Sequence, residues 1–495
     1  MRFLIDTNLI IKLEPLDREF EDDSHEAREF ARLIAKAGYR LLIHPAIEHA
    51  FARDADIDRA NRMRQLSEKY PTLQAPPSDD KVSQTLGSYA EGTNDWVDIQ
   101  LIAAVDDGLV DYVVTEDQDL IRRLQRLGIR ERGLTLTAAN TLLRSLTDEP
   151  IDPPARVERV LMHELPHGDP IWESFRDEYP EFDDWFRKAR ADERTAWCIS
   201  QNGRLAAVAI VKREEDRPYE LMGRVLKMSS FKVSEEFQGR RYGELLLRAV
   251  FDYAHANGYD RLYVTVFPHH QRLIALFEDF GFFDFNATTK LGEVVLAKDR
   301  ESAATGATGT EDPLEYHLRF GPPAIASHAE RWFIVPIQPR LRRLLFPASG
   351  DQTVLPLPEL GAWREASGNA LKKAYLSRTS SRLVDPGSVL LFYESEHPQA
   401  LVFAGVVEDV LVSRDVQEIR AFTSTRTVYA NDEIAQMTAD GDVLSILFRF
   451  DRQLDPPIAL SELLEQGVLS DAPRSVTSVR PEGLQWLKNQ ILAPR

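Results

Sequence analysis

The chain opens with an apolar run, Phe3-Leu4-Ile5, that leads directly into Asp6. Such a run predicts a buried strand, so Asp6 is expected at the carboxyl end of the first strand. Open α/β sheets bind their ligands at the carboxyl ends of the strands. A single aspartate at that point often only caps a helix, so a functional site here requires further acids from elsewhere in the chain.

Three later acids occupy comparable places. Glu48 falls in the first turn of a helix that follows a short apolar strand. Asp98 shares a helix face with Asp95, because the two residues are three apart. Asp117 directly follows a third apolar strand. Strand and helix patterns alternate over residues 1–146, which predicts a parallel sheet with helices on both faces and brings these acids toward one edge.

The acids Asp6, Glu48, Asp98 and Asp117, in this order, resemble the PIN-domain family of metal-dependent ribonucleases over residues 1–147. The resemblance implies that all four are catalytic residues and ligands of one metal site. Carboxylate oxygens suit Mg²⁺ or Mn²⁺, and such a metal lowers the pKa of a bound water and stabilises charge on the scissile phosphate. Four converging carboxylates without a cation would repel one another, which also favours a metal.

Two interpretations of these acids stay open. In the first, the acids bind a metal, and Thr7, Asn8 and Thr115 orient water or the metal without being ligands themselves. In the second, the acids are unrelated surface groups and helix caps. Asp119 is expected to be a solvated residue at the start of a helix rather than a ligand.

A second set of patterns follows a proline-rich stretch at 148–154, which predicts a linker. Asn202-Gly203 is a strong hairpin signal between two apolar strands. A longer strand at 224–233 runs into a polar turn, and a helix is expected over 244–256. This order of strand, turn and helix can cradle a phosphate, because backbone N–H groups at a helix N-terminus point at the anion.

The polar turn resembles the loop with which GNAT acetyltransferases grip the pyrophosphate of acetyl-CoA, Gln/Arg-x-x-Gly-x-Gly/Ala. Gln238 and Gly243 match it, whereas Arg241 stands where the first glycine is usual. The Arg241 side chain is expected either to crowd the pyrophosphate or to contact it with its guanidinium. The resemblance covers residues 155–300 and implies acetyl-CoA as the cofactor. The residues expected to bind it are Phe231, Lys232, Val233, Gln238, Gly239, Arg240, Arg241, Tyr242 and Gly243.

A second GNAT signature is a strand, a helix and then Gly-Phe, which the chain matches up to Gly281-Phe282. The tyrosine that often protonates the departing CoA thiolate in this family would fall at Phe277, so that acid is missing. His269 and His270 are close in the sequence, and histidine titrates near neutral pH. They are expected either to replace the missing acid or merely to end a strand.

A low-complexity stretch at 302–310 predicts a flexible linker. Beyond it, the pattern Asp385-Pro386-Gly387-Ser388 before a strand, followed by Ala404-Gly405-Val406-Val407-Glu408, resembles the PUA-like and ASCH group of small β-barrels. The resemblance covers residues 325–495 and implies RNA or modified bases as partners. The alternative is a barrel that serves only for packing or dimerisation. A locally basic set is expected to contact phosphates: Arg340, Arg342, Arg343, Lys372, Lys373, Arg378 and Arg382.

Composition sets further limits. The single cysteine, Cys198, excludes an intramolecular disulfide and a Cys-rich zinc site, and it fits a reducing, cytoplasmic setting. Asp6 interrupts any signal-peptide core and no apolar run is long enough to span a bilayer, so no membrane partner is expected. The net charge of −19 argues against steering of nucleic acid by the whole chain, so RNA binding would have to depend on local sites.

The 495 residues exceed what one hydrophobic core supports, and the expected fold class is α/β and multidomain. It comprises a parallel-sheet PIN-like domain at 1–147, a mixed-sheet GNAT-like α+β domain at 155–300 and a PUA-like β-barrel at 325–495. The resemblances imply a metal-dependent ribonuclease fused to an acetyltransferase or acetyl-CoA sensor, with a relation to toxin–antitoxin systems left open. The alternatives are an N-acetyltransferase with an inactive PIN domain and a non-catalytic nucleic-acid-binding regulator.

The expected partners follow from these assignments. They are RNA of unspecified type and a protein or aminoacyl group as acetyl acceptor. A homodimer is compatible with the sequence as well.

Overall fold

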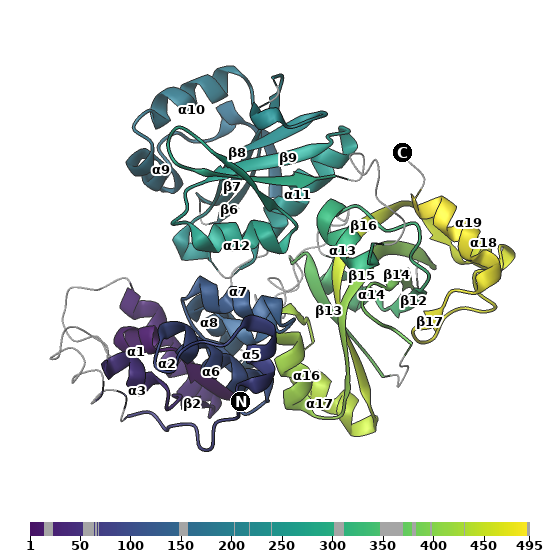
Figure 1. Ribbon diagram of the computed structural model, residues 1–495. Coiled ribbons are helices and arrows are strands. Elements are labelled where there is room, and N and C mark those ends of the chain that lie inside the picture. The colour runs from purple at the N-terminus through teal and green to yellow at the C-terminus, as the bar shows by residue number, and fades with distance from the viewer. Residues whose placement is uncertain are drawn as a thin grey trace. The chain divides into compact units, whose positions relative to one another are not determined.

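Figure 1 shows a computed structural model of the chain, which divides into two compact units. The first unit comprises Met1–Ile151, Ser413–Thr425 and Tyr429–Ala439. The second comprises Asp152–Val412, Arg426–Val428 and Asp440–Arg495. The three domains expected from the sequence are a finer division, which stays a prediction. The structure describes residues 1–13, 23–52, 64, 67, 69–147, 157–201, 203–216, 218–238, 240–300, 311–346, 370–378, 383–396, 398–429 and 431–492.

The first unit is built on a four-stranded sheet in the order β2-β1-β3-β4, in which each adjacent pair is parallel. Its strands are β1 (Arg2–Ile5), β2 (Arg40–Leu42), β3 (Tyr112–Val114) and β4 (Gly133–Leu134). Its helices are α1 (Thr7–Leu13), α2 (Asp23–Ala37), α3 (Ile47–Ala52), α5 (Asp80–Leu86), α6 (Asn94–Asp106), α7 (Gln118–Arg126), α8 (Leu136–Thr147), α16 (Val416–Thr423) and α17 (Asn431–Asp440).

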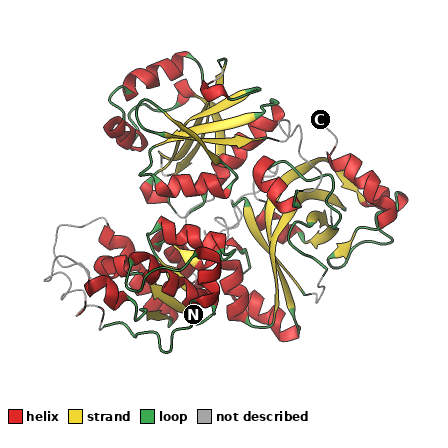
Figure 2. Ribbon diagram, in the orientation of Figure 1, coloured by secondary structure: helices red, strands yellow, loops and turns green. Residues whose placement is uncertain are grey.

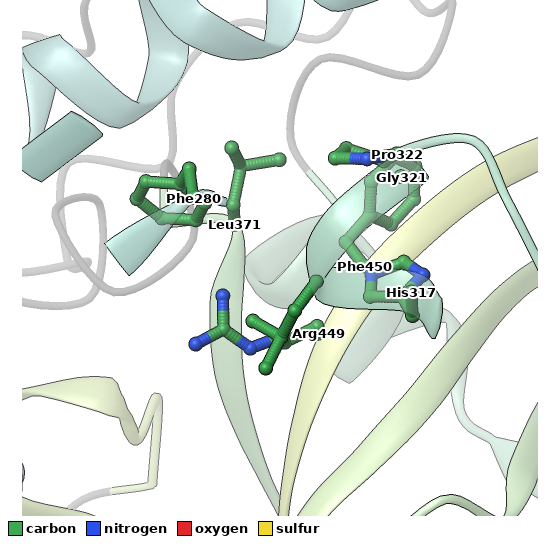
Figure 3. Close-up of a pocket in the computed structure, with 8 residues that line it drawn as sticks. Phe280, His317, Gly321, Pro322, Leu371, Arg449 and Phe450 are labelled. Carbon is green, nitrogen blue, oxygen red and sulfur yellow. The ribbon is translucent and has the colours of Figure 1, made fainter. Parts of the chain in front are cut away.

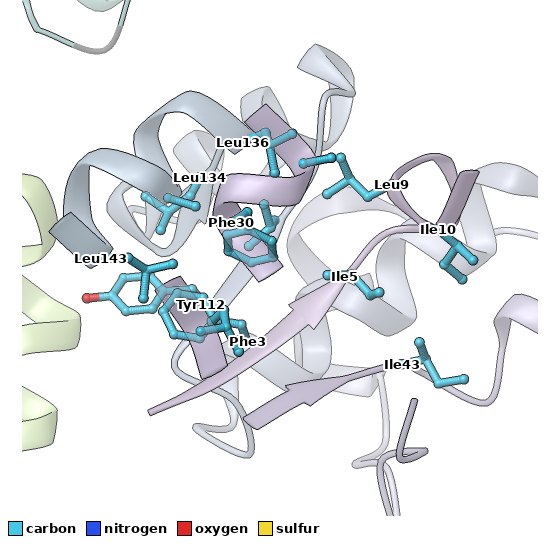
Figure 4. Close-up of a cluster of buried hydrophobic side chains, with 14 of the residues drawn as sticks. Phe3, Ile5, Leu9, Ile10, Phe30, Ile43, Tyr112, Leu134, Leu136 and Leu143 are labelled. Atoms are coloured by element: carbon cyan, nitrogen blue, oxygen red, sulfur yellow. The ribbon is translucent and has the colours of Figure 1, made fainter. Parts of the chain in front are cut away.

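Side chains of β1 alternate between two hydrophobic cores. Phe3 and Ile5 point to one face and pack with Tyr112 of β3 and with residues of α1, α2 and α8 (Figure 4). Leu4 points to the other face and packs with Val113 and with residues of α5, α6 and α7. A sheet buried on both faces is typical of parallel strands, whose crossover helices cover both sides. The predicted parallel sheet is confirmed.

Local details of this unit follow the sequence. Glu48 lies in the first turn of α3. Asp95 and Asp98 both lie near the start of α6. Gly38 follows the last residue of α2 and has φ +66°, a conformation that glycine adopts without strain because it lacks a Cβ.

Helix α16 packs into the same unit although it lies far along the chain. Ala421 of this helix is buried in the core that contains Phe3. The Tyr112 hydroxyl donates a hydrogen bond to the Arg420 carbonyl oxygen at 2.8 Å, and burial raises the pKa of Tyr112 above its ordinary value. Two stretches of the range assigned to a C-terminal barrel, which include α16 and most of α17, thus belong to the first unit.

The second unit contains two mixed sheets. The strands of the seven-stranded sheet are β5 (Val157–Leu161), β6 (Thr195–Gln201), β7 (Arg204–Glu214), β8 (Val225–Val233), β9 (Arg261–Val266), β10 (Phe283–Thr288) and β11 (Val294–Asp299). Those of the six-stranded sheet are β12 (Trp332–Ile337), β13 (Lys372–Ser377), β14 (Val389–Glu394), β15 (Ala400–Ser413), β16 (Val443–Ala459) and β17 (Thr477–Ser478). The helices are α9 (Glu173–Glu178), α10 (Phe182–Ala191), α11 (Tyr242–Ala256), α12 (Gln271–Asp279), α13 (Pro313–Phe320), α14 (Pro339–Leu345), α18 (Leu460–Glu465) and α19 (Pro481–Leu492).

The seven-stranded sheet has the order β10-β11-β9-β8-β7-β6-β5 and carries helices on both sides (Figure 2). On one face, Phe182 and Phe186 of α10 pack with Cys198 and Val208 of the sheet. On the other face, α11 packs with β6 and β7, and the ring of its Tyr253 lies edge-on to Trp197 at 5.2 Å. The hairpin of β6 and β7 forms where it was predicted, although Asn202 lies outside the described residues.

The six-stranded sheet has the order β13-β16-β15-β14-β12-β17. Within it, β14 and β15 pair as antiparallel neighbours. Within the described ranges the hydrogen-bonded order does not join β13 to β17. Closure into a PUA-like barrel therefore stays a prediction, and the two expected linkers at 148–154 and 302–310 lie outside the described residues. No described helix is long and apolar enough to cross a membrane.

One buried carboxylate joins the two sheets of the second unit. Glu244 in the first turn of α11 pairs with Arg241 at 2.6 Å and with Arg426 at 2.7 Å. It also accepts hydrogen bonds from the backbone N–H groups of Leu371 and Lys372, which lead into β13. Burial alone would raise the pKa of Glu244, but the two guanidinium groups outweigh burial and lower the pKa to about 2.

We expect the second unit to depend on the charge of this carboxylate. A carboxyl whose folded pKa lies below its unfolded pKa stabilises the fold above the unfolded pKa, and this contribution is lost as the pH falls through the folded pKa. For Glu244 the window runs from about 4.5 down to about 2. The shift corresponds to about 3 kcal/mol, and Glu244→Gln should lower the free energy of unfolding by a similar amount at pH 7.

Urea unfolding followed by tryptophan fluorescence measures this loss, because Trp172, Trp197 and Trp332 report on the second unit. The control is Glu462→Gln, which removes an exposed carboxylate from the first turn of α18 and should leave the unfolding midpoint unchanged. Equal midpoints for the two variants would contradict a stabilising role for the Glu244 charge.

Candidate active site

Strands β8 and β9 run parallel and then part. They pair from Val225 opposite Arg261 to Met228 opposite Val264. Beyond that pair, β8 continues to Val233 and β9 continues to Val266 without a further ladder pair in the described part of either strand. The carboxyl ends of the two strands therefore leave an opening in the sheet.

A bulge in β8 marks the level at which the strands part. Ile210 of β7 lies opposite Ser230, and the next residue of β7 lies opposite Met228, so Ser229 is the extra residue on β8. Bulges bend a strand and re-aim its side chains, and they are frequent beside functional sites. Here the bulge accompanies the departure of β8 from β9.

Two backbone donors of β8 face this opening. The Ser234 N–H donates to the Ala206 carbonyl oxygen at 2.9 Å, on the side of β7. Backbone N–H groups alternate in direction along a strand, so those of Phe231 and Val233 point to the other side, where β9 has parted. The expected cofactor residues Phe231 and Val233 thus offer donors to an extended ligand.

Helix α11 begins at the same edge of the sheet. It starts at Tyr242, earlier than predicted, because Arg241 turns the chain with φ 58° and ψ 27°, in the left-handed region. The helix is 15 residues long, and its first N–H groups form an anion-binding terminus. The Arg241 guanidinium is directed to Glu244, with the Nη1–Oε1 distance at 2.6 Å.

The other residues of the turn have structural contacts. A Cβ on residue 243 would lie 3.0 Å from Leu276 of α12, so Gly243 permits a close approach of the two helices. Tyr242 is buried, and Gln238 accepts a hydrogen bond from Arg272 at 3.2 Å. The Arg240 guanidinium lies over the Phe237 ring at 5.4 Å, and Gly239 lies outside the described residues.

Position 277 supplies no proton donor. Phe277 is fully buried, and its ring lies 5.3 Å from that of Phe231 and 5.0 Å from that of Phe282. An apolar ring packed in the interior therefore stands where the GNAT resemblance led us to look for a tyrosine hydroxyl.

The short helix α9 is tied to the ends of both parted strands. Lys232 at the end of β8 donates a hydrogen bond to Ser174 of α9 at 2.5 Å. His270, which follows β9, lies 2.8 Å from Glu178 of the same helix, and His269 lies 3.2 Å from it. Burial alone would raise the pKa of Glu178, but the hydrogen bonds from His270 and His269 prevail and lower it.

A second polar group adjoins α9. The Tyr179 hydroxyl donates to Glu293 at 2.7 Å, and the Thr265 hydroxyl donates to the same oxygen at 3.2 Å. Burial and the negative charge of Glu293 raise the pKa of Tyr179 above its ordinary value. Polar groups of both signs thus surround the end of β9.

The sequence did not single out Ser174, Glu178 or Tyr179. Glu178 is the last residue of α9 and Tyr179 follows it, and no local spacing connects them with the histidines. Only the packing of α9 over the strand ends reveals them.

In the first unit, three of the four predicted acids influence one another. Asp6 is buried and accepts a hydrogen bond from the Thr115 hydroxyl at 2.8 Å. Burial, together with the charges of Asp6, Asp117 and Asp95, raises the pKa of Asp98 to about 7 against the opposing effect of Arg123. Carboxylates that resist ionisation near like charges are the donor type that fits a divalent cation.

These acids are not gathered into a tight cluster. Among the described residues, the ligand atoms of Asp6, Asp98 and Asp117 are not all within 4.8 Å of one another. The Arg123 guanidinium lies 3.1 Å from Asp98 and also contacts Asp95, so a metal would have to displace it. Asp117 caps α7 by accepting a hydrogen bond from the Asp119 N–H.

Glu48 stands apart from this group. Its side chain is exposed and pairs with Arg64 at 3.0 Å, and its charge is not among those that shift the pKa of Asp98. Asp119 is exposed in the first turn of α7, as expected, and pairs with Arg122 at 3.0 Å. Of the four acids predicted from the sequence, Asp6, Asp98 and Asp117 are thus linked by the effect of their charges on the pKa of Asp98.

The basic set of the C-terminal range is partly internal. Lys372 and Lys373 are buried, and Lys372 pairs with Asp279 at 2.8 Å and Glu408 at 3.0 Å. Arg342 pairs with Glu394 at 3.2 Å. Lys372 and Arg342 are thus paired with acids of the same unit, and the buried Lys373 does not face solvent, so these three side chains offer little to a phosphate backbone. Arg340 and Arg343 are exposed, and Arg382 lies outside the described residues.

A small cavity lies between α13 and the strands of the six-stranded sheet (Figure 3). Its volume of about 10 Å³ has room for about one water, so it is not a ligand site. The Arg449 guanidinium that lines it donates to the Asp279 carbonyl oxygen at 2.8 Å. The lining residues are Phe280, His317, Leu318, Gly321, Pro322, Leu371, Arg449 and Phe450.

Comparison with solved structures finds GNAT and ASCH proteins. An IAA acetyltransferase from Bacillus cereus ATCC 14579 is 18% identical, with 29% of this chain and 99% of that chain covered and a TM-score of 0.23. A GNAT family acetyltransferase from Elizabethkingia anophelis with acetyl-CoA bound is 15% identical, with coverage of 29% and 97% and a TM-score of 0.22. An ASCH protein from Zymomonas mobilis is 13% identical, with coverage of 32% and 92% and a TM-score of 0.24. These TM-scores are too low to assign a fold.

Comparison with curated proteins gives no match. A family model does match part of the chain. Residues 159–282, which extend from β5 through the parted strands to the end of the Gly-Phe signature, match the model of the acetyltransferase (GNAT) family. This range contains the opening between β8 and β9, the N-terminus of α11 and the groups of α9. Residues 159–282 are thus the part of the chain that is similar to GNAT acetyltransferases.

Proposed function

We propose that the chain transfers the acetyl group of acetyl-CoA to an acceptor at the opening between β8 and β9. The observation that carries this proposal is the parting of two parallel strands beside the N-terminus of α11. Binding of acetyl-CoA needs a row of hydrogen-bond donors for the extended pantetheine arm and an anion-binding site for the pyrophosphate. The N–H groups of Phe231 and Val233 supply the first, and the first turn of α11 supplies the second.

The acceptor would approach from the side of α9. Lys232, Ser174 and Glu178 lie around the strand ends on that side and give an acceptor both cationic and anionic partners. A protein or aminoacyl group with a free amine is the acceptor class we propose. Its nitrogen would form a bond to the thioester carbon, and the carbon–sulfur bond would break. The departing CoA thiolate would take up the proton that the nitrogen releases.

Removal of one strand donor should weaken cofactor binding. Val233→Pro eliminates the N–H that faces the opening and keeps the bond on the β7 side, which Ser234 makes. A lost hydrogen bond of this kind costs about 1 kcal/mol, so the dissociation constant for acetyl-CoA should rise by roughly five- to tenfold. Isothermal titration calorimetry with acetyl-CoA measures the change.

Val233→Ala is the matched control, because it shortens the side chain and retains the N–H. It should bind acetyl-CoA with nearly the affinity of the original protein, and thermal unfolding of both variants verifies that the sheet is intact. If the proline and alanine variants bind equally well, the β8 amide does not hold the cofactor.

A second candidate function is favoured by the raised pKa of Asp98. We propose that Asp6, Asp98 and Asp117 of the first unit take part in metal-dependent cleavage of RNA. The parallel sheet and the mutual repulsion of these acids support this reading. Bound Mg²⁺ or Mn²⁺ would supply a water of lowered pKa and would stabilise charge on the phosphate. Glu48 is left out of this proposal, because its side chain pairs with Arg64 and its charge is not among those that shift the pKa of Asp98.

Asp98→Asn tests this second function. The change keeps the size of the side chain and removes one negative charge from the group. Cleavage of a single-stranded and of a structured RNA in the presence of Mn²⁺ should slow by roughly 100-fold or more. The metal-free protein should be as stable as the original or more stable, because the buried charge and its repulsion are removed.

Asp119→Asn provides the comparison, since Asp119 is exposed and pairs only at the surface of α7. It should cleave RNA at the original rate. Unchanged cleavage by Asp98→Asn would remove Asp98 from the mechanism, whereas loss of folding would identify it as a structural residue.

A further inference from the structure

Two adjacent histidines present their rings to the same point. His269 and His270 follow β9, and the His270 N–H donates to the Phe267 carbonyl oxygen at 3.0 Å, which turns the chain before α12. Because of this turn, both imidazoles face α9, with their ring centroids 4.2 Å apart. Consecutive residues of an extended strand would have pointed to opposite sides.

Both rings converge on one carboxylate oxygen. The Nε2 atoms of His270 and His269 lie 2.8 Å and 3.2 Å from Oε1 of Glu178. The ligand atoms of all three residues are within 4.8 Å of one another. In the described part of the chain, no other group of three or more histidine, cysteine and acidic residues meets this criterion.

The spacing is close to that of a coordination sphere. Zinc binds histidine nitrogen and carboxylate oxygen at about 2.0–2.1 Å with tetrahedral geometry, which places neighbouring ligand atoms about 3.4 Å apart. The 3.2 Å separation already fits, and the 2.8 Å separation has to open by roughly half an ångström. Side-chain rotations of the half-exposed residues suffice for that change.

The ligand set also defines the class of metal. Two imidazoles and one carboxylate form an open zinc site, in which a fourth position is left to water or another ligand. Exposure agrees with an open position, since the side chains of His269 and His270 are 63% and 38% exposed. Neutral imidazole ligands disfavour Mg²⁺, which prefers oxygen donors.

We propose that Glu178, His269 and His270 bind a divalent transition metal of the zinc class over the carboxyl end of β9. The metal links α9 to the strand end with bonds to three side chains, next to the contact of Ser174 with Lys232. Its open position faces the side from which the acceptor would approach. The last point alone depends on the proposed acetyl transfer, whereas the metal site itself does not.

Titration of the metal-free full-length chain with Zn²⁺, in competition with a chromophoric chelator, tests the site. Replacement of a residue that only supports a ligand typically lowers metal affinity 10–100-fold, so loss of a ligand itself should cost at least about 100-fold. His270→Ala, His269→Ala and Glu178→Gln should each lose one equivalent of tight Zn²⁺ binding. Titration with Co²⁺ should give visible absorption bands for the original chain that the variants lack.

The matched control is His167→Ala. His167 is also an exposed histidine beside an acid, with Nε2 at 2.9 Å from Asp183, but it lacks a third ligand. This variant should retain the full stoichiometry. His270→Gln keeps a hydrogen-bond donor for Glu178 without an imidazole, so it separates loss of metal from loss of structure.

Two results would overturn the proposal: an original chain that binds no Zn²⁺ more tightly than about 100 μM, or cluster variants with the same stoichiometry and affinity as His167→Ala. Calorimetry with acetyl-CoA on the same metal-free protein keeps the two proposals apart. Zinc binding without acetyl-CoA binding would refute the proposed transfer and leave the metal site standing, and the reverse result would refute the metal site alone.

Discussion

The parallel pairing of β8 and β9 decides where the second unit can bind a ligand. All other described pairs in the seven-stranded sheet are antiparallel, so only here must the chain cross back between two adjacent strands. Helix α11 makes that crossing, and its N-terminus therefore lies at the edge where both strands end. The strands also part at this edge. The parallel pairing thus brings the free side of the β8 backbone and the N–H groups of the first turn of α11 together.

The turn that leads into α11 contains an arginine in a conformation that favours glycine. Arg241 adopts the left-handed backbone conformation that glycine reaches without strain, so the turn into α11 is preserved. Its guanidinium is bound to Glu244, which Arg426 and two backbone N–H groups also contact. Arg241 is thus part of a buried ion-pair network around Glu244.

Carboxylates in the two units illustrate how neighbours set their behaviour. Asp98 is partly buried near other acids, and its pKa rises to about 7. Glu244 is buried more completely, but two guanidinium groups lower its pKa to about 2. Glu178 lies between these cases, because hydrogen bonds from two histidines lower its pKa. The surroundings of Asp98 favour an added cation. Glu244 already has two guanidinium groups as cationic partners. Beside Glu178, two histidines offer nitrogen ligands.

The sequence by itself determined the local elements: the parallel sheet of the first unit, the hairpin of β6 and β7, the end of α2 at Gly38 and the turn before α11. Apolar periodicity and turn residues report burial and backbone conformation over a few residues, which is all that these features need. Tertiary structure decided which side chains meet. Glu178 and His269 are 91 residues apart, and Glu244 and Arg426 are 182 apart. It also paired Glu48 with Arg64 and turned Lys372 and Lys373 into the interior, because such contacts depend on how whole elements pack and on which charges become partners after burial.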